Sequence, residues 1–180
     1  MTDDPADETE PPAAPEGTAG GGGAAPLNAV TGLWQDVIAD MEATAEGYRE
    51  RGWTVVEVHP GDVAVPEGRE GGRWGLDVLV PDGEFDEMER LVEGDPAFDE
   101  SEVYRGKSGG LVLLVVAMLD PDTEHAILFP VYYDEKRARD VLDRAIEEGE
   151  LPTHLRPLDE RAVVTFRHEA VDLFLPDDDA

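Results

Sequence analysis

Residues 111–119, LVLLVVAML, form an apolar run of nine consecutive positions that is rich in valine and leucine. An apolar run without alternation is typical of a strand covered on both faces or of a buried helix segment. Its short length and its β-branched residues favour the strand. Nine residues are also too few to cross a membrane, which takes about 20. We therefore expect a buried strand here and no membrane-spanning segment.

A second apolar run, residues 125–133, HAILFPVYY, follows the first after the short segment Asp120-Pro121-Asp122-Thr123-Glu124. The proline in this segment presets φ, and the aspartate side chains accept hydrogen bonds from nearby backbone groups, which favours a turn. The two runs are therefore expected to form an antiparallel hairpin at the centre of a sheet.

Three other segments show apolar residues at helical spacing, namely residues 28–51, 84–93 and 134–148. A glycine follows each of them, as is common where a helix ends.

Shorter apolar segments predict the remaining strands, and they are residues 53–59, 62–65, 74–80, 101–105, 154–158 and 162–169. The Gly106-Lys107-Ser108-Gly109 segment predicts a turn, because the spacing of a phosphate-binding loop is absent and a strand follows. Few helices lie between the strands. The order of elements therefore predicts an α+β fold, a mostly antiparallel sheet with about three helices packed on one face.

The composition divides the chain into three parts. Residues 1–26 contain six acidic residues, no basic ones and much glycine, proline and alanine, which predicts a disordered tail. Residues 27–176 have the length and apolar content of a single α+β domain. Residues 177–180, Asp-Asp-Asp-Ala, predict a short acidic C-terminal tail.

Acidic residues outnumber basic ones by 43 to 14, and only two of the basic residues are lysines. A carboxylate-rich surface stays hydrated in concentrated salt, where charge repulsion is screened over about 3 Å at 1 M. We therefore interpret the chain as a halophilic, cytoplasmic protein. The absence of cysteine excludes disulfides and thiolate metal sites. The negative charge also argues against nucleic-acid binding, which needs clustered lysine and arginine.

Catalytic and ligand-binding residues are hard to find by pattern. The two serines do not lie in a nucleophile motif, and the four histidines show no paired metal-ligand spacing. Among the acidic residues, Asp77 and then Glu57 are the most probable to be partly buried, although alternation on a strand predicts that both face water. No metal or cofactor is assigned from the sequence.

Five segments resemble an uncharacterised family of small acidic proteins from haloarchaea. They are residues 40–53, 59–63 (HPGDV), 75–81 (GLDVLVP), 153–158 (THLRPL) and 163–166 (VVTF). The resemblance covers about residues 27–176. It implies a halophilic, cytoplasmic protein, and it implies no particular activity.

Two of these segments contain the best candidates for a ligand site, which are His59, Asp62, His154 and Arg156. Together they offer imidazole, carboxylate and guanidinium groups for binding an anion or a metal. The leading hypothesis is a cytosolic module without catalysis that binds a protein partner or a small ligand. A homodimer with a purely structural role is a further possibility. The alternative is a small metal-dependent hydrolase that uses His59, Asp62 and His154, and this requires the three side chains to converge.

Overall fold

The computed structural model describes residues 27–177, so the tails expected at residues 1–26 and 178–180 lie outside the described residues. The described part contains three α-helices, eight strands and two short 3-10 helices. In chain order they are α1 (Leu27–Glu50), β1 (Thr54–Glu57), β2 (Asp62–Ala64), η1 (Arg69–Gly71), β3 (Leu76–Leu79), α2 (Asp82–Val92), β4 (Glu100–Ser108), β5 (Leu111–Asp120), β6 (His125–Asp134), α3 (Arg139–Glu148), β7 (Leu151–Arg156), β8 (Val164–His168) and η2 (Val171–Phe174).

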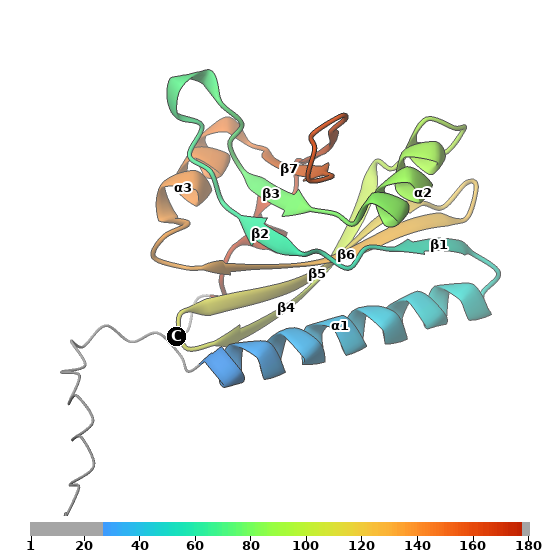
Figure 1. Ribbon diagram of the computed structural model, residues 1–180, viewed down its shortest axis with the longest axis horizontal. Helices are drawn as coiled ribbons and strands as arrows, with labels where there is room; N and C mark the ends of the chain where they lie inside the picture. The colour runs from blue at the N-terminus through green and yellow to red at the C-terminus, as the bar shows by residue number, and fades with distance from the viewer. Residues whose placement is uncertain (1–26, 178–180) are drawn as a thin grey trace, which may run out of the picture.

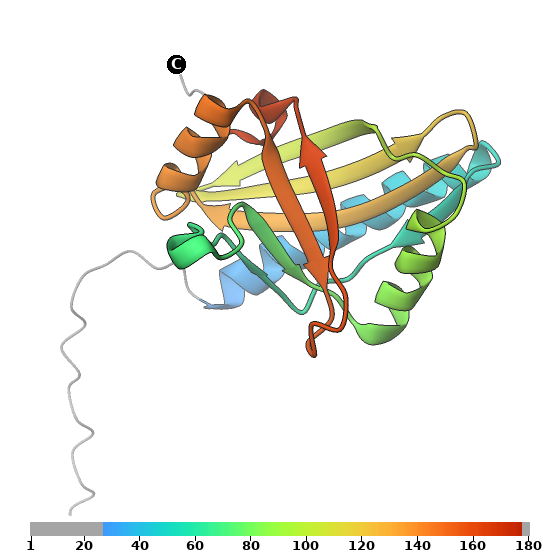
Figure 2. The ribbon, with the colours of Figure 1, turned by 90° about the horizontal axis from the view of Figure 1, so that it is seen from above.

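The strands form two four-stranded sheets, with the orders β1-β6-β5-β4 and β2-β3-β7-β8. Each sheet contains one parallel pair, β1 with β6 and β3 with β7, and the other pairs are antiparallel. Strands β7 and β8 run across the long strands of the first sheet (Figure 2). The α+β class and the mostly antiparallel pairing are therefore confirmed, with two sheets where the sequence predicted one.

The β5–β6 hairpin lies at the centre of the first sheet, as its sequence predicts. Alternate residues of β5 belong to two different cores. Val112, Leu114 and Val116 face the second sheet, whereas Leu113 and Val115 face α1. The unbroken apolar run is therefore explained by a strand that is covered on both faces.

The helices lie on both sides of the first sheet rather than on one face (Figure 1). Helix α1 packs against the outer face through Met41, Ala45 and Tyr48, which follow helical spacing. Phe85 of α2 and Val141 of α3 belong instead to the core between the two sheets. The sequence predicted helices on one face of the sheet only. Helices are found on both sides because the hairpin is apolar on both of its faces, and each face needs a cover.

Two local expectations were wrong. The Gly106-Lys107-Ser108 segment continues β4, and the turn comes at Gly109, whose φ is +60°. Helix α3 begins at Arg139, several residues later than expected. The side chain of Asp134 accepts hydrogen bonds from the backbone N–H groups of Lys136 and Arg137, and it holds the intervening residues in a turn.

Within residues 27–177, no helix combines the length and the apolar character that crossing a membrane requires.

Candidate functional site

His59 follows β1 and is held firmly by Glu84, in the first turn of α2. The backbone N–H of His59 donates to Glu84 Oε1 at 2.6 Å, and the imidazole Nδ1 lies 2.8 Å from Glu84 Oε2. A carboxylate only accepts hydrogen bonds, so Nδ1 carries the proton in this contact. The two bonds fix both the position of the ring and the direction of its other nitrogen, Nε2.

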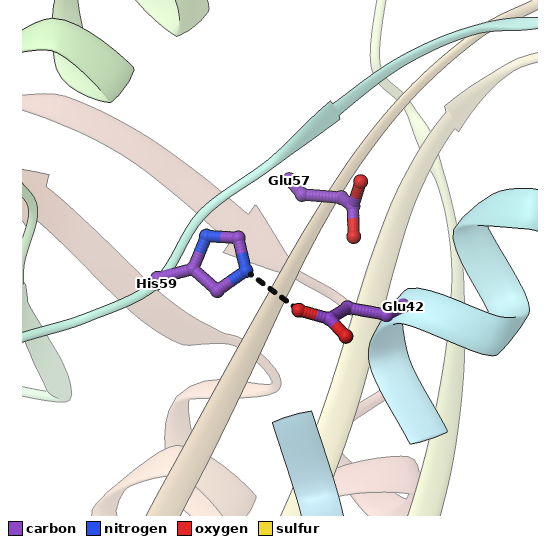
Figure 3. A group of neighbouring side chains, drawn as sticks. All are labelled: Glu42, Glu57 and His59. Carbon is purple, nitrogen blue, oxygen red and sulfur yellow. Dashed lines mark hydrogen bonds and ion pairs between the residues drawn. The ribbon is translucent and has the colours of Figure 1, made fainter. Parts of the chain in front are cut away.

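The Nε2 atom of His59 points toward two further carboxylates (Figure 3). It lies 3.4 Å from Oε1 of Glu42, which comes from the middle of α1. Glu57, at the end of β1, completes the group, and one ligand atom from each of the three residues lies within 4.8 Å of the others. Helix α1, strand β1 and the segment just after β1 thus bring one imidazole and two carboxylates together.

Arg49 positions the third member of this cluster. Its Nη1 lies 2.7 Å from Oε2 of Glu57, and its Nη2 donates to the carbonyl of Val55 at 3.3 Å. A carboxylate has two oxygens, so Glu57 keeps a second oxygen for another contact. With a neutral His59, the three glutamates and Arg49 carry a net charge of about −2, which complements a divalent cation.

The surroundings also change the basicity of His59. Partial burial opposes protonation of the ring, but the hydrogen bond and charge of Glu84, helped by Glu42 and Glu57, raise the pKa of His59 above its ordinary value. The cluster therefore attracts positive charge, either as a proton on His59 or as a bound cation.

The geometry of the cluster suits a metal ion. Two ligands bound at about 2.1 Å with tetrahedral angles lie about 3.4 Å apart, and Nε2 of His59 lies 3.4 Å from Oε1 of Glu42. Histidines that bind metals generally donate their other N–H to a carboxylate or carbonyl. Glu84 occupies that position here.

Asp62, on β2, lies in a different setting from this cluster. It lines a groove of about 210 Å³ together with Trp34 and Tyr132, whose rings meet edge to face at 5.2 Å. Burial and the negative charge of Asp62 raise the pKa of Tyr132.

His154, on β7, uses both of its ring nitrogens within the fold. Nε2 donates to the carbonyl of Trp74 at 2.9 Å, because a carbonyl can only accept. Nδ1 then accepts from the hydroxyl of Thr165 at 2.9 Å. In this tautomer, the hydrogen bonds to Trp74 and Thr165 occupy both ring nitrogens.

Arg156 forms an ion pair with Asp77 on the neighbouring strand, at 2.9 Å. Arg73 lies 3.6 Å from the same carboxylate and also pairs with Glu160. Asp77 is only 9% exposed, so the expectation that its side chain faces water was wrong. The two arginine side chains cover Asp77, which alternation along a strand does not predict.

The four residues singled out from the sequence thus lie in four different local environments. Asp62 pairs with Leu79, and Leu79 pairs with Arg156, so two strand spacings, about 9–10 Å, separate Asp62 from Arg156. The contacts of His59 are with Glu42 and Glu84, whereas those of His154 are with Thr165 and Trp74.

Sequence reasoning named His59 as a ligand candidate but missed Glu42 and Glu84 as its partners. Glu57 was ranked after Asp77 among the acids expected to be partly buried, and it was not linked to His59. Among 43 acidic residues, no spacing marks these three, because they come from α1, α2 and β1 and meet only in the folded chain.

Comparison with known proteins gives a family and no activity. A family model described as a family of unknown function, DUF7529, matches residues 22–176. No curated protein and no solved structure matches the chain.

Proposed function

The chain belongs to the DUF7529 family, whose function is unknown, and we propose that it binds a divalent transition-metal ion through Glu42, Glu57 and His59. An imidazole with two carboxylates is a ligand set that suits Zn²⁺ and similar ions better than Mg²⁺ or Ca²⁺, which prefer oxygen ligands alone. Three protein ligands leave a coordination position for water or a small anionic ligand.

The observation that carries this proposal is the contact between Glu84 and His59. Glu84 accepts from both the backbone N–H and the ring Nδ1–H of His59. A surface ion pair needs only one of these contacts. The two bonds together orient the ring so that Nε2 faces Glu42 and Glu57. A carboxylate that accepts the other ring N–H of a metal-binding histidine orients the ring in the same way.

The proposed setting is the cytoplasm of a haloarchaeon, and the proposed role is binding without catalysis. The support for this setting is the composition, with 43 acidic residues against 14 basic ones and no cysteine. In such a cell the ion must be bound against multimolar K⁺, and a nitrogen ligand favours a transition metal over the alkali cation.

Isothermal titration calorimetry with ZnCl₂ in 2 M KCl tests the proposal. Excess MgCl₂ is included to saturate the many exposed carboxylates, which bind cations weakly. We expect one Zn²⁺ per chain for the natural protein and no saturable binding for His59→Gln. His125→Gln is the matched control, because His125 is the first residue of β6 and contacts Thr123 instead of the cluster. Equal zinc binding by all three proteins would contradict the proposal.

Glu84→Gln separately tests the contact between Glu84 and Nδ1 of His59. We expect it to lower zinc affinity by about 10- to 100-fold, the usual effect of removing the partner of a metal-binding histidine. Glu87→Gln, at an exposed position of the same helix, should leave the affinity unchanged. If the two variants bind zinc equally well, Glu84 does not support a metal site.

A further inference from the structure

Strand β4 is the outermost strand of the first sheet and pairs only with β5 among the described strands. It is nine residues long, and most of its residues are exposed. A long edge strand exposes unpaired backbone groups to other chains, and proteins usually protect such edges with charged side chains, a bulge, a proline or a covering segment. Strand β4 contains no proline and pairs with β5 in an unbroken register.

The edge of β4 is accompanied by a groove beside α1. The helix packs mainly against β1, β5 and β6, and Tyr48 of α1 donates a hydrogen bond to Glu102 of β4 at 2.7 Å. A hollow of about 510 Å³ lies between them, with Asp36 and Asp40 on the helix side and Tyr104 and Gly106 on the strand side. Tyr104 is 50% exposed, so a large aromatic ring faces solvent at the middle of the edge.

The charges of β4 are divided between its two halves. Glu100 and Glu102 lie in the first half, and Arg105 and Lys107 lie in the second, in a chain that has only 14 basic residues. Their side chains also have partners within the chain, since Arg105 pairs with Asp177 and Lys107 with Glu135. In an antiparallel pair of two such strands, the acidic half of one copy lies opposite the basic half of the other.

A two-fold axis through Tyr104 gives the most complete register. Directly opposite residues of antiparallel strands share a face, and Tyr104 is the central residue of Glu100–Ser108. All nine residues then pair. Glu102 lies opposite Gly106 of the partner subunit, and Ser101 lies opposite Lys107 of the partner subunit, so no like charges meet. An axis at Arg105 would instead place two guanidinium groups opposite each other.

We propose that β4 pairs with β4 of a second copy of this chain, which joins the two first sheets into one eight-stranded sheet across a two-fold axis at Tyr104. The two Tyr104 rings form a cross-strand aromatic pair, and the groove beside α1 receives the partner's edge. Both copies are strongly negative, so the dimer requires the screening that concentrated salt provides.

Light scattering coupled to size-exclusion chromatography in 2 M KCl tests the dimer. We expect a dimer for the natural protein and for Tyr104→Phe, which keeps the aromatic ring. Tyr104→Lys places like charges opposite each other and should weaken association by about tenfold or more. Leu158→Lys, at a position 79% exposed and outside β4, is the matched control and should remain dimeric. A monomeric natural protein, or a Tyr104→Lys variant that remains fully dimeric, would overturn the proposal.

Cysteine cross-linking tests the register itself, because the chain has no other cysteine. Tyr104→Cys places two thiols opposite each other, within the Cα separation of about 4.4–6.8 Å that a disulfide needs. Ser108→Cys lies on the same face of the same strand, but its two copies would be separated by roughly 27 Å. We expect oxidation to cross-link the first variant and not the second. Equal cross-linking of both, or cross-linking of Ser108→Cys alone, would refute this register.

Discussion

His168 is the buried ionisable group with the clearest consequence for stability. The side chain is 3% exposed, its Nε2 lies 2.9 Å from the hydroxyl of Thr153, and its ring packs on Phe174. Burial penalises the charged form and lowers the pKa of His168 to about 4. The folded protein therefore holds His168 neutral across the pH range in which an unfolded chain would protonate it.

The pKa of His168 predicts a loss of stability in mild acid. Between pH 6.5 and 4 the unfolded state binds the proton and the folded state does not, so the free energy of unfolding falls as the pH falls. From pH 7 to pH 5, the natural protein should lose about 2 kcal/mol more than His168→Gln. Urea unfolding of both proteins at the two pH values measures this difference. Parallel losses would show that His168 does not titrate on unfolding.

At the scale of residues, the sequence shows which side chains could bind a ligand, but it does not show which other side chains contact them in the fold. It singled out His59 for the imidazole that this residue offers to a ligand. Its partners Glu42 and Glu84 lie 17 and 25 positions away along the chain. Asp77 was expected to face water, because strand alternation does not reveal that Arg73 and Arg156 cover it.

At the scale of elements, apolar patterns predicted most helices and strands, and the places where they failed have local causes. The unbroken apolar run of β5 predicted a strand covered on both faces, and the structure confirms it. The start of α3 was misjudged because Asp134 holds the preceding residues in a turn. The division into two sheets was not predictable, since β3 and β7 pair across more than 70 positions of sequence.

The packing of α1 gives a prediction at this scale. Met41 is fully buried between the helix and the outer face of the first sheet. Met41→Ala should therefore lower the free energy of unfolding by about 2–5 kcal/mol, because it removes apolar contacts and leaves a cavity. Glu46→Ala, at an exposed position of the same helix, should change it by less than about 0.5 kcal/mol. Denaturant unfolding in 2 M KCl compares the two variants. A similarly small loss of unfolding free energy for both would show that Met41 contributes little to the packing of α1 on the sheet.

At the scale of the whole molecule, the net negative charge is the feature with the largest expected effect on how stability depends on salt. Six of the 43 acidic residues lie in residues 1–26, and all 14 basic residues lie beyond them, so residues 27–180 still carry a formal charge of −23. Several exposed ion pairs are present, including those of Arg161 with Asp86 and Arg167 with Glu150. Exposed ion pairs contribute little to the free energy of unfolding. Repulsion among the remaining carboxylates therefore opposes folding at low salt.

The melting temperature should therefore rise as KCl increases from about 0.1 M to 2 M, because screening weakens this repulsion. A thermal melt followed by circular dichroism measures the effect. The same series in NaCl separates charge screening, which both salts share, from an effect specific to potassium. A flat or falling melting temperature in both salts would contradict the halophilic interpretation.

The central claim is that Glu42, Glu57 and His59 bind one metal ion, and crystals soaked in ZnCl₂ test it most directly. Data collected at the zinc absorption edge locate the ion without reference to the protein. We predict one strong anomalous peak about 2 Å from Nε2 of His59 and within bonding distance of both carboxylates, with Glu84 still bound to Nδ1. Zinc found only on scattered surface carboxylates, with Nε2 of His59 unliganded, would contradict the account.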